Sequence, residues 1–182
     1  MSAFEGQSLP LCEIWVDGSA VECLHPVRLG AGWVCVFNGK SRGRSHVISD
    51  APPNKSAALF AELKAATFAL AEAPVEGPIK LYSDRREIID CVNEKAVPRQ
   101  IENSQPEMVP LFQELLALLE GLKVQAYRSR GSNPQSKTCL KKLSPHFSMM
   151  AHDAAHTLAA QASGSRKALD YPVLKKFLLS LE

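Results

Sequence analysis

The order of strand-like and helix-like segments limits the fold of this chain more than any other feature. Three β-rich stretches come first, and the dipeptide Asn38-Gly39 between the second and the third is typical of a two-residue hairpin turn. A helix, a strand, two helices, a strand and a helix follow. Strands separated by helical crossovers run parallel, so the fourth and fifth strands are expected to be parallel to the first. This order predicts an α/β fold with a mixed five-stranded sheet and helices on both faces.

The segments are bounded by turn residues and by changes in apolar periodicity. The expected strands are β-rich runs at residues 11–17, 32–37, 44–49, 78–83 and 122–127. The expected helices are periodic apolar runs at residues 56–73, 85–93, 107–120, 148–162 and 173–181. Residues 94–105 are expected to form a loop, and residues 128–147 are basic and irregular.

Composition and charge indicate one globular domain. The chain has 182 residues, of which 46% are hydrophobic and 22% charged. No apolar run approaches the roughly 18 residues of a membrane span, and no secretory signal is visible, so no membrane partner is expected. The five cysteines are odd in number and lack a C-x-x-C pair, which favours a cytoplasmic protein with packing cysteines. The formal charge of +2 neither requires nor excludes nucleic acid, and no obligate protein partner is implied.

Four acidic residues fall at positions where this fold would bring them together. Asp17 and Asp84 lie at the ends of the first and fourth strands, Glu62 flanks the buried face of the first helix, and Asp153 lies early in the helix after the fifth strand. Carboxylates that converge raise one another's pKa and repel unless cations bind them. Oxygen ligands favour Mg²⁺ or Mn²⁺, and two such ions about 4 Å apart can promote phosphoryl displacement.

The four acids lie in segments that resemble the motifs of type 1 ribonucleases H. The segments are Val16-Asp-Gly-Ser19, Ala61-Glu-Leu-Lys-Ala65, Tyr82-Ser-Asp84 and His152-Asp-Ala-Ala-His-Thr-Leu-Ala159. The resemblance implies an RNase H-like fold and a catalytic domain over residues 1–163, with residues 164–182 as a tail whose short amphipathic helix packs on it. It also implies an endonuclease with two Mg²⁺ ions, for which Mn²⁺ can substitute, that cuts the RNA strand of RNA–DNA hybrids and leaves 5′-phosphate and 3′-hydroxyl ends. The implied catalytic and metal-binding residues are Asp17, Glu62, Asp84 and Asp153.

Two regions are expected to contact the nucleic acid. Gly18 and Ser19 would lie near the scissile strand, where 2′-hydroxyls identify RNA. Gly18 is expected to resist larger residues, either because it adopts a positive φ or because the nucleic-acid backbone approaches it. The second region is a basic segment without acids that can bind phosphates. Its candidate residues are Arg128, Arg130, Asn133, Lys137, Lys141 and Lys142.

The chain also departs from the family pattern, and alternatives remain open. The loop after the fifth strand lacks the usual histidine, for which His146 is a candidate replacement. His152 and His156 have the i, i+4 spacing of helical zinc ligands but lack an evident third ligand, which favours two partly exposed histidines. Asp17 alone could form a turn, and Asp84 alone could cap a helix. The alternative functions are another nuclease of the same fold, either a DNA recombinase-type enzyme or an exonuclease, and a non-catalytic nucleic-acid-binding module.

Overall fold

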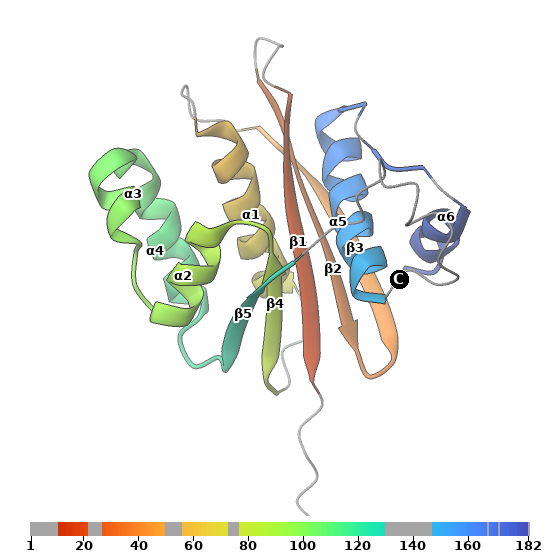
Figure 1. The fold of residues 1–182 in the computed structure, drawn as a ribbon, viewed down its shortest axis with the longest axis horizontal. Coiled ribbons are helices and arrows are strands. Elements are labelled where there is room, and N and C mark those ends of the chain that lie inside the picture. The colour runs from red at the N-terminus through yellow and green to blue at the C-terminus, as the bar shows by residue number, and fades with distance from the viewer. Residues whose placement is uncertain are drawn as a thin grey trace, which may run out of the picture.

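The computed structural model describes residues 11–21, 27–49, 56–72, 77–129, 147–166, 168–170 and 172–181. Within these ranges one five-stranded sheet has the order β3-β2-β1-β4-β5 (Figure 1). The strands are β1 (Cys12–Val21), β2 (Arg28–Phe37), β3 (Lys40–Ile48), β4 (Ile79–Ser83) and β5 (Val124–Arg128). β1, β2 and β3 pair antiparallel, whereas β4 pairs parallel with both β1 and β5. The predicted fold class is confirmed.

Helices cover both faces of this sheet (Figure 1). On one face lie α1 (Ala57–Glu72), α2 (Arg86–Glu94) and α4 (Val109–Leu118); on the other lie α5 (Phe147–Ser163) and α6 (Pro172–Leu179). Successive residues of a strand point to opposite faces. In β1, Val16 accordingly belongs to the core under α1, and Trp15 packs with Leu174 of α6. No helix in the described ranges is both long and apolar enough to cross a membrane.

Several local predictions are confirmed. Asn38 and Gly39 form the hairpin turn with φ of 52° and 73°, the left-handed values that a two-residue turn of this kind requires. Trp15 and Trp33, which lie in the first two predicted strands, are both buried in the core. Cys12, Cys35 and Cys91 are buried free thiols; Cys23 and Cys139 lie outside the described residues.

Strand β1 is longer than predicted, and the turn considered at Asp17 is wrong. β1 continues to Val21 because β2 pairs with its second half, from Asp17 opposite Gly32 to Val21 opposite Arg28. The parallel pairing with β4 ends earlier, at Trp15 opposite Tyr82. Asp17 therefore lies inside a strand, but two residues beyond the last residue of β1 that pairs with β4.

The loop predicted over residues 94–105 is also wrong, because it contains the short helix α3 (Arg99–Ser104). Pro98 precedes this helix, where its missing N–H removes no helical hydrogen bond. Ile101 is its buried residue, and a 3₁₀ turn (Pro106–Met108) leads on to α4. A six-residue helix with one buried side chain is too short to give an apolar period.

Glycines let both covering helices approach the sheet closely. A Cβ at Gly18 would collide with the backbone nitrogen of Glu62 in α1, and a Cβ at Gly32 with the backbone oxygen of Ala155 in α5. Gly18 is not among the described glycines with positive φ, so that reason for its expected intolerance of larger residues is wrong. The close packing of α1 on β1 supplies the reason instead.

We predict that Gly18→Ala lowers the free energy of unfolding by about 1–3 kcal/mol, the usual cost of forcing an extra carbon into a packed core. The added carbon meets helix backbone, which cannot rotate away. Gly43→Ala is the matched control, because its Cβ would meet the flexible end of Leu181, with Cδ1 at 2.6 Å. Chemical denaturation of both variants measures the difference. A Gly18→Ala variant as stable as Gly43→Ala would show that α1 does not depend on this close approach.

Candidate functional site

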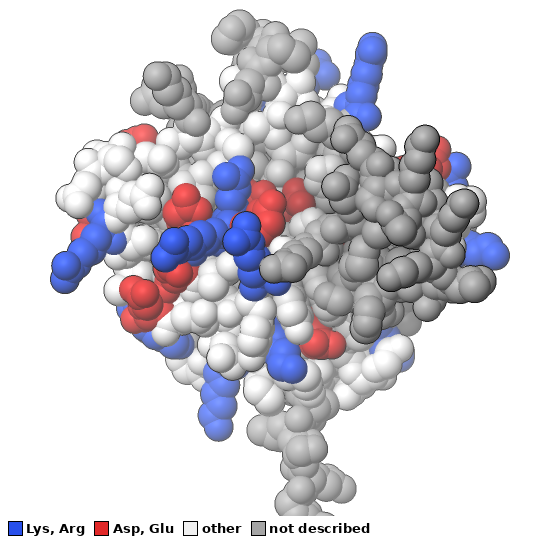
Figure 2. Space-filling model, in the orientation of Figure 1, with Lys and Arg blue, Asp and Glu red and all other residues white. Residues whose placement is uncertain are grey.

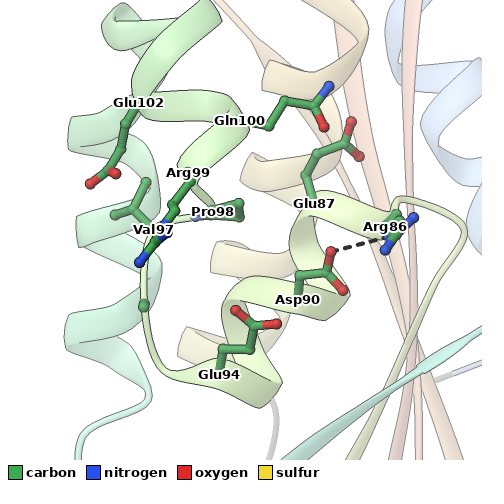
Figure 3. A pocket seen from close by; sticks show the side chains of 10 residues that line it. Arg86, Glu87, Asp90, Glu94, Val97, Pro98, Arg99, Gln100 and Glu102 are labelled. Carbon is green, nitrogen blue, oxygen red and sulfur yellow. Dashed lines mark hydrogen bonds and ion pairs between the residues drawn. The ribbon is translucent and has the colours of Figure 1, made fainter.

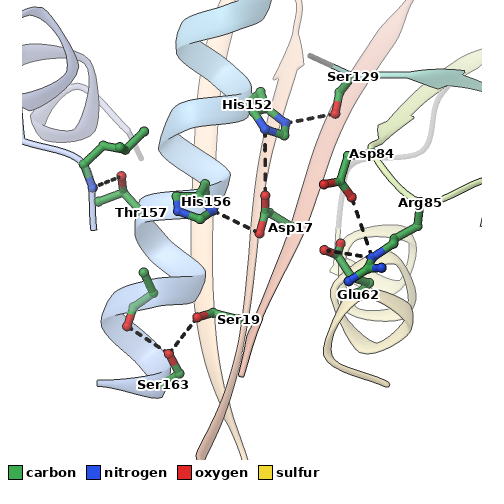
Figure 4. Close-up of polar contacts among 12 residues, drawn as sticks. Asp17, Ser19, Glu62, Asp84, Arg85, Ser129, His152, His156, Thr157 and Ser163 are labelled. Atoms are coloured by element: carbon green, nitrogen blue, oxygen red, sulfur yellow. Dashed lines mark hydrogen bonds and ion pairs between the residues drawn. The ribbon is translucent and has the colours of Figure 1, made fainter. Parts of the chain in front are cut away.

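Three of the four predicted acids gather at the end of the sheet where β4 stops (Figure 4). Asp17 comes from β1, Glu62 from α1, and Asp84 directly follows β4. Asp17 is 5% exposed and Glu62 only 3%, whereas the side chain of Asp84 is 50% exposed. Acidic and basic side chains intermingle near the centre of this face of the molecule (Figure 2). The structure thus places one half-exposed and two buried carboxylates close together.

Glu62 is in the least favourable environment of the three. Burial raises the pKa of its carboxyl well above the ordinary value of 4.5, and the charges of Asp17 and Asp84 raise it further. Arg85 and the backbone N–H of Gly18, which donates a hydrogen bond, oppose this shift in pKa. Oε2 of Glu62 is buried and has no hydrogen-bond partner among the described residues. A buried carboxylate of this kind needs a proton or a nearby cation.

The guanidinium group of Arg85 lies beside two of these carboxylates. Its Nε lies 3.7 Å from Oε1 of Glu62 and 4.0 Å from Oδ1 of Asp84. The backbone N–H of Arg85 donates a hydrogen bond to Oγ of Ser83 at 3.1 Å. Arg85 is also the N-cap residue of α2, so the alternative in which Asp84 caps this helix is wrong. Sequence reasoning missed the role of Arg85, although the residue directly follows a predicted acid.

Two histidines of α5 point at Asp17 (Figure 4). Nδ1 of His156 lies 3.3 Å from Oδ1 of Asp17, and Nε2 of His152 lies 3.9 Å from Oδ2. The other ring nitrogen of His152, Nδ1, shares a hydrogen bond of 2.9 Å with Oγ of Ser129. His152 is 8% exposed, so the expectation of two partly exposed histidines is wrong for this residue. The i, i+4 spacing was the signal that placed both imidazoles on one side of α5.

The donor set suits a divalent cation, although the side chains do not yet enclose one. No group of three or more histidine, cysteine or acidic side chains in the described ranges is arranged to hold a metal ion. Nitrogen-bearing side chains lie beside the acids instead: Arg85 next to Glu62 and Asp84, the histidines next to Asp17. The unpartnered Oε2 of Glu62 is the feature that fits a hard cation.

Asp153, the fourth predicted acid, follows His152 on α5 and is 1% exposed. One residue along a helix turns the side chain by about 100°, so Asp153 points in a different direction from His152. His152 and His156 of the same helix pair with Asp17. Metal ligation by Asp153 stays a prediction.

The predicted nucleic-acid-binding residues are only partly within the described chain. Gly18 faces α1, Ser19 is buried and accepts a hydrogen bond from Oγ of Ser163 at 3.0 Å, and Arg128 is exposed at the end of β5. The remaining candidates lie outside the described residues: Arg130, Asn133, Lys137, Lys141, Lys142 and His146. Binding of nucleic acid by these residues stays a prediction.

No protein-family model and no curated protein matches this chain, but solved structures do. The RNase H domain of PFV superposes with a TM-score of 0.61 at 17% identity, covering 87% of this chain and 96% of that one. LC9-RNase H1, a type 1 RNase H with the type 2 active-site motif, superposes with a TM-score of 0.61 at 16% identity, covering 95% of this chain and 82% of that one. RNase H1 from the halophilic archaeon Halobacterium salinarum superposes with a TM-score of 0.56 at 18% identity, covering 84% of this chain and 96% of that one.

One similar solved structure is a much longer chain, of which this fold forms one part. The chain covers 21% of the prototype foamy virus protease–reverse transcriptase, with a TM-score of 0.63 at 18% identity. At such identities the likeness concerns the fold. The fold of this chain is RNase H-like, and the acid-bearing end of its sheet is the candidate site.

We predict that Glu62→Gln raises the melting temperature of the metal-free protein near neutral pH. Each kcal/mol added to the free energy of unfolding should raise the melting temperature by about 2 °C or more. Because folding raises the pKa of this carboxyl, the native state binds its proton more tightly than the unfolded state does. Native stability is therefore lost as the pH rises from about 4.5 toward the raised pKa, and glutamine removes this loss.

Melting curves in EDTA at about pH 5 and about pH 8 measure this difference. Glu114→Gln is the control, because that carboxylate pairs with Lys64 on the exposed surface at 2.9 Å. Equal pH dependence in both variants would contradict the assignment of Glu62 as a destabilising buried acid.

Proposed function

We propose that this chain is a divalent-metal-dependent endonuclease that hydrolyses the RNA strand of RNA–DNA hybrids. The observation that carries the proposal is the meeting of Asp17, Glu62 and Asp84 at one end of an RNase H-like sheet, with an unpartnered oxygen of Glu62 among them. Three of the four acids implied by the sequence motifs thus lie together. The similar structures are named as ribonucleases H, which favours this chemistry over the others that the fold supports.

In this proposal Asp17, Glu62, Asp84 and Asp153 hold two Mg²⁺ ions, for which Mn²⁺ can substitute. Bound ions would supply an activated water and would stabilise the departing 3′ oxygen, so that the products would carry 5′-phosphate and 3′-hydroxyl ends. The strand β1 and the helix α1 hold Asp17 and Glu62 in buried positions, while the side chain of Asp84 is half exposed. Ser129 fixes the ring of His152 beside Asp17.

A cleavage assay on matched substrates tests the proposal. A labelled RNA–DNA hybrid, duplex RNA, duplex DNA and both single strands are incubated with Mg²⁺, with Mn²⁺ and with EDTA. We expect cleavage of the RNA strand of the hybrid, only with a divalent ion. Cleavage of DNA instead would assign another nuclease activity of this fold. Binding of nucleic acid without cleavage of any substrate would leave a non-catalytic module.

We predict that Asp17→Asn lowers the turnover of the hybrid by about 100-fold or more, in line with the loss of one group that stabilises transition-state charge. Asparagine is nearly isosteric but a poor ligand for a hard dication. The control is Glu13→Gln in the same strand, whose carboxylate accepts a hydrogen bond from Tyr82 at 3.0 Å rather than joining the cluster. Circular dichroism verifies that both variants fold. Near wild-type turnover in Asp17→Asn would remove Asp17 from the reaction.

We predict that neutralising Lys137, Lys141 and Lys142 together raises KM and flattens the salt dependence of binding, while turnover at saturating substrate changes little. Each lysine that no longer neutralises a phosphate should reduce the log–log salt slope by about one unit. His146→Ala is the contrasting variant. If His146 takes the role of the histidine that this loop lacks, His146→Ala should lower kcat while KM stays nearly constant. An unchanged salt slope in the triple variant would exclude these lysines from substrate binding.

A further inference from the structure

The guanidinium group of Arg85 places a positive charge next to Glu62. Arg85 Nε is within 4.0 Å of an oxygen of both Glu62 and Asp84, the two acids on the α1 and β4 sides of the cluster. The side chain of Arg85 is 39% exposed, yet its Nε atom is buried. The guanidinium thus reaches inward from the start of α2 and ends between two carboxylates that are proposed metal ligands (Figure 4).

The interactions of this guanidinium nitrogen are electrostatic rather than hydrogen-bonded. Charge-assisted N–H···O bonds are normally about 2.7–2.9 Å long, and 3.7 Å is well beyond that range. In agreement, both Nε of Arg85 and Oε2 of Glu62 lack a hydrogen-bond partner among the described residues. Arg85 therefore reduces the repulsion between the acids without satisfying their oxygens. A cation that binds these oxygens directly would satisfy them better.

We propose that Arg85 is the resident counter-cation of Glu62 and Asp84 and competes with a divalent ion for these two carboxylates. Without metal, the guanidinium holds the cluster together; when the ion binds, Arg85 leaves the space between the acids. This inference rests on the proposed metal-dependent function and adds to it a residue that sets the affinity for the ion. It also accounts for the observation that the described acids do not form a three-ligand metal group in this conformation.

The next residue provides a matched control. Arg86 has the same charge, but its side chain is 90% exposed, and its Nε pairs with Oδ2 of Asp90 at 3.3 Å (Figure 3). It lines a separate hollow of about 740 Å³ between α2 and α3, together with Glu94 and Glu102. Removing Arg86 changes the net charge of the protein by the same amount as removing Arg85, but leaves the counter-cation in place.

Titration of each protein with Mn²⁺ alone, in the absence of nucleic acid, tests the proposal. We expect Arg85→Gln to lower the Kd for Mn²⁺ about fivefold or more. A unit charge about 4 Å away changes affinity roughly fivefold at the dielectric constant of bulk water and several hundredfold at that near a protein surface. Arg86→Gln should stay within about threefold of wild type, since exposed charges are largely screened. Arg85→Lys keeps the charge and should stay closer to wild type than Arg85→Gln.

Several results would overturn the inference. Unchanged or weaker Mn²⁺ binding in Arg85→Gln would do so while leaving the metal-dependent function intact. Weaker binding of the hybrid at unchanged Mn²⁺ affinity would also do so, and would assign Arg85 to substrate phosphate. If no variant binds Mn²⁺, the proposed metal-dependent function fails as well, which the cleavage assay shows independently.

A measurement on the wild-type protein keeps the inference testable if Arg85→Gln does not fold without metal. The Nε–H proton of Arg85 is buried, so its exchange with water, followed by nuclear magnetic resonance, reports on its shielding. We expect this exchange to become faster when Mg²⁺ saturates the site, whereas that of Arg86 should not change. Exchange at Arg85 that is unchanged or slower with Mg²⁺ would overturn the inference.

Discussion

The buried carboxylate of Glu62 is the constraint around which the end of this sheet is arranged. A carboxylate with 3% exposure loses most of its hydration, and Asp17 and Asp84 add negative charge beside it. Such a group persists only with compensation, which here comes from Arg85 and from the N–H of Gly18. The compensation is incomplete, since one oxygen lacks a partner among the described residues. An incompletely compensated acid is a source of binding energy for a cation, at a cost in stability before the cation arrives.

The fold holds this acid in place through its backbone. Gly18 lets α1 lie directly on β1, and the pairing of β1 with β4 stops at Trp15 opposite Tyr82. The end of β4 therefore leaves room beside β1 for carboxylates from three elements. On the opposite face, Gly30 and Gly32 let α5 approach equally closely, which brings His156 to Asp17. The geometry of the site is thus set by close helix–sheet packing and not by long side chains that reach across a gap.

Much of this arrangement is visible in the sequence, because strand alternation, the Asn38-Gly39 turn and the helical periods are local signals. The four acidic motifs also indicated which elements lie near one another in the fold, which local signals do not contain. The sequence did not predict those parts of the structure that depend on residues distant in the chain. β1 extends to Val21 only because β2 pairs with it, and α3 has Ile101 as its one buried side chain. The environment of each acid escaped for the same reason: burial and neighbouring charges follow from the tertiary packing.

Arg85 shows how sequence reasoning can miss part of a site. Arg85 directly follows Asp84, and His152 directly precedes Asp153, so the same elements that carry the acids also carry their nitrogen-bearing neighbours. A motif search for acids finds the groups that can bind metal but not the groups that balance them without metal. Because a cluster of like charges is unstable without that balance, the affinity for an ion depends on both sets. Two chains with the same acids on the same fold can therefore differ widely in metal affinity, according to whether a residue such as Arg85 stands beside them.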